Sequence, residues 1–159
     1  MILAVDVGNS NTTVGLFNGT GELLFRALLE TSRSKTRDQC AIELLGVFQL
    51  YGADACTVDG AILSSVVPPL TTIFTDAIAR LTGIPPMVVG PGIRTGLNIK
   101  AEIHNQLGSD IVASSVAAIA KYPSPIVMVD MGTATSLSLI VGSVYEGCII
   151  MPGLALALD

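Results

Sequence analysis

The sequence contains no tryptophan, one histidine and only eight lysine and arginine residues. Its formal net charge is −5, and no run of basic residues occurs. Proteins that bind nucleic acids broadly need concentrated positive charge, because they neutralise a row of phosphates. The composition therefore argues against nucleic acid as a partner, whereas a single nucleotide would need only a local positive potential.

Cysteine is scarce as well. The three residues Cys40, Cys56 and Cys148 are odd in number, far apart and without C-x-x-C spacing, so we expect free thiols in a reducing compartment rather than a disulfide framework or a zinc site. The N-terminus lacks the cationic segment of a signal peptide, and no apolar run approaches the roughly 18 residues of a membrane helix. We therefore expect a soluble, cytoplasmic protein without a membrane partner.

Charged residues make up 13% of the 159 residues, against roughly 25% in a typical soluble domain, while half of the residues are hydrophobic. This composition gives a large core relative to the surface that must cover it. Because monomers rarely expose large apolar patches, we expect a further portion of the protein or a partner subunit to cover apolar faces.

The most informative stretch is at the N-terminus. Residues 2–7 form an apolar run that carries Asp6 near its end, residues 8–11 read Gly-Asn-Ser-Asn, and residues 12–17 are again β-rich. This pattern predicts a strand, a tight polar turn and a returning strand. Backbone N–H groups, hydroxyls and amides of such a turn can surround phosphate oxygens, and the carboxylate can hold a hydrated cation. The alternative is an ordinary hairpin in which Asp6 caps the turn.

A second copy of this design occurs at residues 126–135, where an apolar run again ends in an aspartate, Asp130, followed by a glycine turn with small polar residues. Residues 6–11 align with residues 130–135. Two such hairpins indicate an internal duplication. We therefore predict two related domains whose turns face one cleft.

Turn residues and hydrophobic periodicity predict alternating strands and helices along the rest of the chain. The Gly-rich segment 90–96 matches neither the dinucleotide fingerprint nor the Walker phosphate loop. The expected strands lie at residues 2–7, 12–18, 22–29, 58–67, 87–89, 126–130, 136–141 and 144–151, and the expected helices at 38–51, 70–81, 108–121 and from 154 onward.

Several charged residues permit two interpretations. Arg33, Lys35 and Arg37 either line a solvated entry to a helix or place a cation near an anionic substrate or across a subunit boundary. Asp110 at a helix start is either a first-turn acid that stabilises the helix or a base at the edge of the cleft. The single histidine, His104, lies in a polar segment and is expected to be exposed.

The first copy of the repeat is followed by enough chain for a complete domain, whereas the second copy has only residues 121–159. We therefore expect a first domain at residues 1–120 and an incomplete, truncated second domain at residues 121–159.

Six segments resemble the type III pantothenate kinases, and they occur in the same order along the whole chain. The resemblance implies an α/β fold of the actin-like ATPase (ribonuclease H-like) type, with duplicated domains. It covers about the first three-fifths of the usual length of that family. The segments are residues 6–11, 62–69, 95–97, 108–110, 130–135 and 151–154.

The resemblance also implies the activity. Members transfer the γ-phosphoryl group of ATP to pantothenate, which gives 4′-phosphopantothenate in the first step of coenzyme A biosynthesis. They use Mg²⁺ and a monovalent cation, K⁺ or NH₄⁺, and work as homodimers. ATP and pantothenate are therefore the expected partners.

Site residues follow by position. The resemblance makes Asp110 the general base, Asp130 the potassium ligand and Asp6 a magnesium ligand that acts through water. Residues expected to contact ATP and its phosphates are Asp6, Val7, Gly8, Asn9, Ser10, Asn11, Thr12, Thr13 and Thr133. Residues expected to bind pantothenate are Ala101, Gly108, Ser109, Asp110 and Ile111.

The chain departs from the family pattern at four positions. Ile111 replaces an arginine after the base, Ala101 a pocket tyrosine, His104 a proline and Ser138 an aspartate. Two alternatives therefore stand beside the kinase. One is a catalytically weakened, nucleotide-binding paralogue that regulates or scaffolds, and the other is a transcriptional accessory factor.

Overall fold

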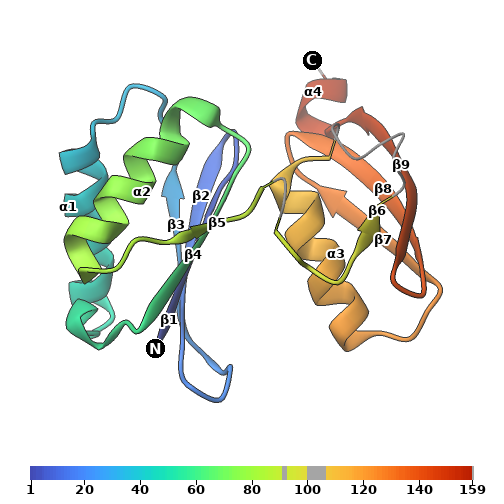
Figure 1. The fold of residues 1–159 in the computed structure, drawn as a ribbon. Coiled ribbons are helices and arrows are strands. Elements are labelled where there is room, and N and C mark those ends of the chain that lie inside the picture. Colours follow the sequence, from blue (N-terminus) through green and yellow to red (C-terminus); the bar gives the residue numbers. More distant parts are fainter. Residues whose placement is uncertain (91–92, 100–106, 159) are drawn as a thin grey trace. The chain divides into compact units, whose positions relative to one another are not determined.

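The computed structural model describes residues 1–90, 93–99 and 107–158. The chain divides into two compact units, Met1–Val89 and Gly90–Asp159 (Figure 1). This division reflects which residues contact one another, whereas the domains expected at residues 1–120 and 121–159 are defined by the sequence repeat. The domain boundary at residue 120 therefore stays a prediction.

The first unit contains a five-stranded sheet in the order β3-β2-β1-β4-β5. Strands β1, β2 and β3 form an antiparallel meander, and β4 and β5 continue the sheet in parallel to β1. The elements are β1 (Ile2–Val7), β2 (Asn11–Phe17), β3 (Leu23–Glu30), α1 (Arg37–Leu50), the 3₁₀ helix η1 (Ala55–Thr57), β4 (Gly60–Ser65), α2 (Pro68–Thr82) and β5 (Met87–Val88).

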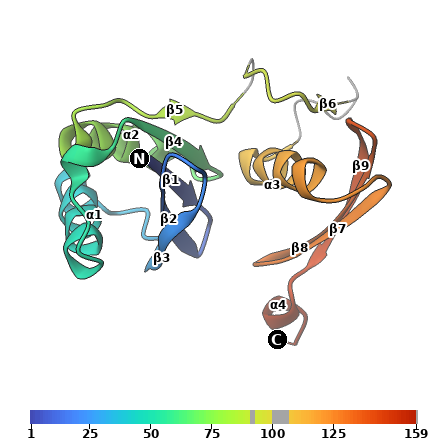
Figure 2. The ribbon, with the colours of Figure 1, turned by 90° about the horizontal axis from the view of Figure 1, so that it is seen from below.

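Local signals fix both helices of this unit. The Thr36 side chain accepts from the Gln39 amide and the Gln39 side chain accepts from the Thr36 amide, so α1 begins with a capping box. Two prolines occupy the first turn of α2, and Gly83, at a φ of 76°, ends it. Both helices lie on one face of the sheet (Figures 1 and 2), where they bury alternate residues of β1 in a continuous core.

The second unit contains a four-stranded sheet in the order β6-β9-β8-β7. Strands β7, β8 and β9 form an antiparallel meander, and β6 pairs with β9 in parallel. The two-residue β6 was not predicted, since it is too short to show alternation. The elements are β6 (Asn98–Ile99), α3 (Ser109–Lys121), β7 (Ile126–Met131), β8 (Ala134–Val141), β9 (Val144–Pro152) and α4 (Leu154–Leu158).

The two meanders repeat one another, but opposite faces of their sheets are covered. In the first unit α1 and α2 bury the face that carries Val5, which is 2% exposed. In the second unit α3 packs on the other face, over Ile126 and Ile140, and Val129, equivalent to Val5, is 55% exposed. This open apolar face agrees with the expectation from composition, since Val127, Met131, Ile149 and Met151 are exposed as well.

Candidate active site

The first predicted turn is present and has four residues. Val7 pairs with Thr12 across β1 and β2, and the amide of Gly8 donates to the carbonyl oxygen of Asn11 at 2.9 Å. A Cβ at Gly8 would lie 3.0 Å from that oxygen, so the close approach favours glycine. Asn9, Ser10 and Asn11 are exposed, so their polar groups are accessible to a ligand.

Asp6 lies at the centre of a polar row on the sheet. Its backbone partner on β2 is Thr13, and its partner on β4 is Ser64. Residues that pair directly across neighbouring strands project from the same face. The carboxylate of Asp6, which is exposed, is therefore flanked by a hydroxyl on each side, as suits an oxygen-lined site for a hydrated cation.

The loop that follows β3 is fastened to this turn. The amide of Thr31 donates to the carbonyl oxygen of Ser10 at 3.0 Å, and the hydroxyl groups of Thr31 and Thr12 lie 2.8 Å apart. Thr12 is buried, so the hydrogen bond between the two hydroxyl groups holds the loop against the turn below the protein surface. Beyond this hydrogen bond, the guanidinium of Arg33 donates from Nη2 to Oδ1 of Asn9 at 3.4 Å.

The second turn is one residue shorter than the first. Met131 pairs with Thr135, and the amide of Gly132 donates to the carbonyl oxygen of Ala134 at 3.0 Å. As a result Asp130 faces Ser136 across the strands, just as Asp6 faces a hydroxyl in the first unit. The repeat therefore includes a hydroxyl partner for each aspartate. The alignment of residues 6–11 with residues 130–135 assumed turns of equal length, whereas the second turn lacks one residue.

Asp110 lies in the first turn of α3, which follows Gly108 and begins at Ser109. Its Oδ1 accepts from the amide of Ile111 at 2.8 Å, and its place in the first turn is compatible with both the stabilising acid and the base. The carboxylate can accept further hydrogen bonds, since it offers about four lone-pair sites. The Ile111 side chain packs against the hydrophobic core of the second unit.

No sequence pattern predicts a buried polar pair in the second unit whose electrostatics include Asp110. Tyr145 is 0% exposed, and its hydroxyl lies 2.8 Å from Oγ of Ser138. The pKa of Tyr145 is raised to about 12, and burial of the phenol is the largest cause. The hydrogen bond with Ser138 lowers this pKa, whereas the hydrogen bond with Cys148 and the charges of Cys148 and Asp110 raise it further. Asp110 thus lies near a phenol that stays protonated at neutral pH.

Ala101, which is expected to bind pantothenate, and His104, which is expected to be exposed, lie outside the described residues. Asp6 and the turn at residues 8–11, where the phosphates are expected to bind, belong to the first unit, and Asp110, Asp130 and Thr133 belong to the second. That both turns face one cleft stays a prediction.

The described residues contain no group of three or more histidine, cysteine or acidic side chains placed to hold a metal. Magnesium is nevertheless often held by one or two carboxylates together with substrate phosphates, so the carboxylate of Asp6 fits such a role chemically. The three cysteines are free thiols, as predicted. No helix in the described part of the chain is long and apolar enough to span a bilayer.

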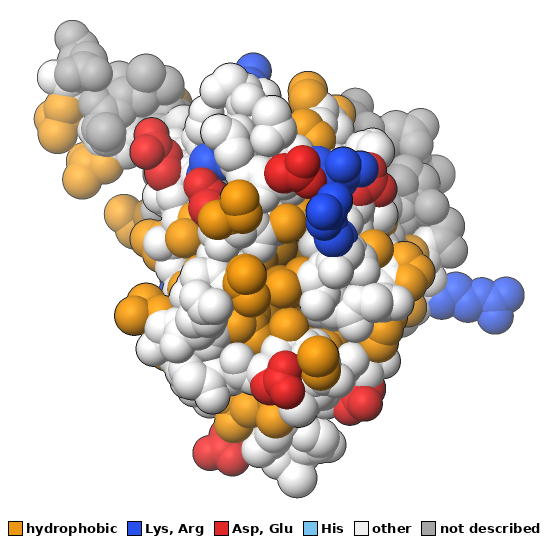
Figure 3. Space-filling model, turned by 90° about the vertical axis from the view of Figure 1, so that its left-hand side faces the viewer, with side chains coloured by type: hydrophobic (Ala, Val, Ile, Leu, Met, Phe, Trp, Pro, Cys, Tyr) orange, Lys and Arg blue, Asp and Glu red, His pale blue; other side chains and the backbone are white. Residues whose placement is uncertain are grey.

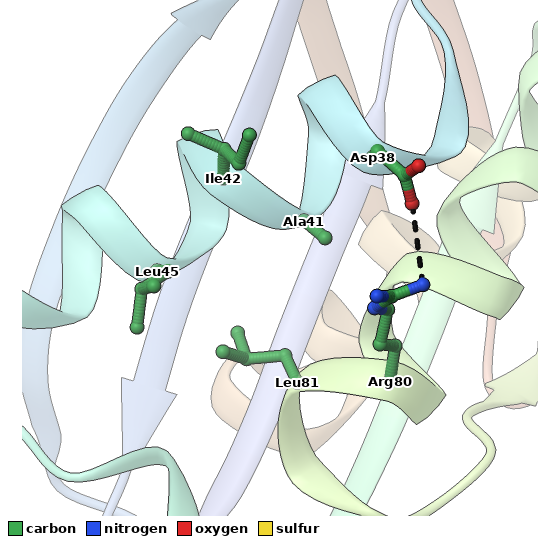
Figure 4. Close-up of a pocket in the computed structure, with 6 residues that line it drawn as sticks. All are labelled: Asp38, Ala41, Ile42, Leu45, Arg80 and Leu81. Carbon is green, nitrogen blue, oxygen red and sulfur yellow. Dashed lines mark hydrogen bonds and ion pairs between the residues drawn. The ribbon is translucent and has the colours of Figure 1, made fainter.

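The helical side of the first unit carries a separate hollow of about 440 Å³ between α1 and α2 (Figures 3 and 4). Arg80 and Asp38 form an ion pair at one end at 3.4 Å, and apolar side chains line the rest. It lies on the face opposite Asp6 and includes none of the predicted site residues. Its apolar lining consists of Ala41, Ile42, Leu45 and Leu81.

Solved structures share the fold. The chain resembles the crystal structure of a putative 2-dehydro-3-deoxygalactonokinase from Sinorhizobium meliloti, with a TM-score of 0.55, 13% identity and coverage of 94% of this chain and 53% of that one. It also resembles a conserved putative Baf family transcriptional activator from Campylobacter jejuni, with a TM-score of 0.53, 20% identity and coverage of 96% and 55%. The predicted α/β fold of the actin-like ATPase and sugar kinase type is confirmed.

Sequence comparison identifies the family. The type III pantothenate kinase of Listeria monocytogenes serotype 4a (strain HCC23) is 39% identical over 160 residues, which cover 100% of this chain and 61% of that protein. The chain thus spans about three-fifths of the length of the curated relatives it matches. The family model described as type III pantothenate kinase matches residues 2–159, and the chain therefore belongs to the type III pantothenate kinase family.

Proposed function

We propose that this protein transfers the γ-phosphoryl group of ATP to the primary hydroxyl of pantothenate and so makes 4′-phosphopantothenate for coenzyme A biosynthesis. The observation that carries the proposal is the match of residues 2–159 to the type III pantothenate kinase family. The two glycine turns, each with an aspartate opposite a hydroxyl, support it in structural terms.

The first unit supplies the phosphate site in this proposal. Phosphoryl transfer needs in-line positioning and neutralisation of charge more than covalent chemistry from the protein. The turn offers backbone amides and the exposed side chains of Asn9, Ser10 and Asn11, while Val7 and Thr12 are buried supports. Asp6 and Thr13 lie side by side in register, where Asp6 would hold Mg²⁺ through water.

The second unit supplies the acceptor side. Asp110 would take the proton of the attacking hydroxyl as general base, since a carboxylate beside the nucleophile suits this task. Asp130 would bind the monovalent cation, K⁺ or NH₄⁺, and Thr133 in the adjacent turn would contact ATP. The segment Gly108–Ser109, together with Ala101 and Ile111, would bind pantothenate, and the half-buried Ile111 would contribute apolar contact.

Two further properties belong to the proposal. We propose a homodimer, which the open apolar face of the second unit would accommodate because such faces are rarely left in water. We also propose a cytoplasmic location, because the three cysteines are free thiols, the state expected in a reducing compartment.

One observation favours a second candidate, a weakened paralogue that binds nucleotide and regulates or scaffolds. Ile111 follows the proposed base directly and packs into an apolar cluster. A hydrocarbon side chain cannot pair with the carboxylate of pantothenate. The phosphate turns would then bind ATP while the acceptor site turned over poorly.

The decisive experiment follows ADP release by the protein with ATP, Mg²⁺ and K⁺, in the presence and absence of pantothenate. The kinase predicts ADP release that depends on pantothenate, with 4′-phosphopantothenate identified by mass spectrometry. ATP binding without turnover would support the weakened paralogue and refute the kinase. A gel-shift assay with promoter DNA tests the transcriptional role, which the net charge of −5 disfavours.

A further inference from the structure

The loop between β3 and α1 is held against the phosphate turn by two strong contacts. The Thr31 amide donates to the Ser10 carbonyl oxygen at 3.0 Å, and the hydroxyl groups of Thr31 and Thr12 lie 2.8 Å apart, with Thr12 buried. These contacts fix the backbone two residues before Arg33. The conformation of the loop backbone therefore positions Arg33 beside the turn.

The two cations of this loop, Arg33 and Lys35, and Arg37 at the start of α1 differ in their partners. Lys35 pairs with Glu43 at 2.9 Å, and Arg37 pairs with Asp38 at 3.3 Å. Among the residues that the structure describes, Arg33 takes part in no ion pair, and its guanidinium donates to the neutral amide oxygen of Asn9 at 3.4 Å. Arg33 is thus the loop cation that is directed at the turn and not neutralised by a carboxylate.

We propose that Arg33 binds the phosphate groups of the nucleotide at the Gly8–Asn11 turn. This inference rests on the proposed function, because it assumes that the turn receives ATP. The turn offers neutral donors and lies beside the negative charge of Asp6, so a polyphosphate needs a cation there. A guanidinium presents five N–H donors in a fork that matches phosphate oxygens, and Arg33 has to give up only one long contact to a neutral amide.

The test compares Arg33→Ala, Arg33→Lys and Arg37→Ala, with affinities for ATP, ADP and adenosine measured by titration calorimetry. Charge-assisted hydrogen bonds to phosphate predict that Arg33→Ala weakens ATP binding about 10- to 100-fold. Adenosine carries no phosphate, so its affinity should stay within about twofold. Arg33→Lys should recover part of the loss, because it restores the charge but not the fork.

Arg37→Ala is the matched control, since it removes a neighbouring exposed cation that pairs with Asp38 away from the turn. The ATP affinity of Arg37→Ala should equal that of the wild type, and all three variants should keep the wild-type melting temperature. Unchanged ATP affinity in Arg33→Ala, or an equal loss for adenosine, would overturn the inference. Turnover of pantothenate by the wild type, measured on the same sample, tests the kinase separately, so a loss of ATP affinity in Arg33→Ala without wild-type turnover supports Arg33 and refutes the kinase.

Discussion

The backbone amide of Gly153 donates to the carbonyl oxygen of Thr133 at 3.1 Å, and a Cβ built on Gly153 would stand 2.4 Å from that same oxygen. The residue that follows β9 is therefore packed directly against the second glycine turn. Only a residue without a side chain allows this approach, because the atoms it meets belong to the backbone and cannot swing away.

We accordingly predict that Gly153→Ala lowers the free energy of unfolding by about 1–3 kcal/mol, as is typical of overpacking. Displacement of Thr133 should also weaken ATP binding. Urea denaturation and nucleotide titration measure the two effects. The control is Gly46→Ala, where a Cβ meets no atom within 4 Å inside α1; alanine should stabilise that helix slightly. Equal stability of the two variants would contradict the packing argument.

Asp110→Asn should abolish turnover, with a fall of about 10²- to 10⁴-fold, while ATP affinity stays nearly intact. The amide keeps the shape and the hydrogen bond to the Ile111 amide but cannot take a proton from the acceptor hydroxyl. Steady-state kinetics and ATP titration provide the measurement. Asp76→Asn, at an exposed position of α2, is the control for loss of one charge. A marked loss of nucleotide affinity in Asp110→Asn would argue against the role of base.

The repeat places two valines, Val5 and Val129, at equivalent positions of the two sheets, and they allow the burial of the two sheet faces to be compared. Val5 and Val129 each precede the aspartate of their turn, but Val5 is 2% exposed and Val129 is 55% exposed. Val5→Ala should cost about 2 kcal/mol of stability, because it leaves a cavity in the core. Val129→Ala should change stability by less than about 0.5 kcal/mol. Chemical denaturation measures both, and an equal loss at Val129 would reveal that this face is covered in solution.

Stability should fall at alkaline pH because of Tyr145. Its pKa is about 12 in the folded protein, above the ordinary value of 10.0, so the folded state holds the phenolic proton more tightly than the unfolded state. This contribution to stability, on the order of 2–3 kcal/mol, is complete below pH 10 and is lost as the pH rises towards 12. Tyr145→Phe should lower stability at pH 7, since it leaves Ser138 buried without its partner, and should flatten the decline above pH 10.

Local sequence determined the secondary structure around the site. The predicted helix at 70–81 is observed as Pro68–Thr82, and the predicted strand at 2–7 as Ile2–Val7. Prolines, a left-handed glycine and an apolar run act within a few residues, so their effect is readable from the chain. The Asp-x-Gly motif likewise predicted both hairpins, because a tight polar turn after a strand is a local property.

The sequence by itself thus determined the family, the repeat and the two turns, since each depends on residues that are near neighbours. Only the tertiary structure decided that Arg33, of three neighbouring cations, reaches the first glycine turn, and that Tyr145 meets Ser138 near Asp110. It also decided that opposite faces of the two related sheets are covered. Such contacts depend on strand register, on loop conformation and on helix packing, which no local pattern encodes.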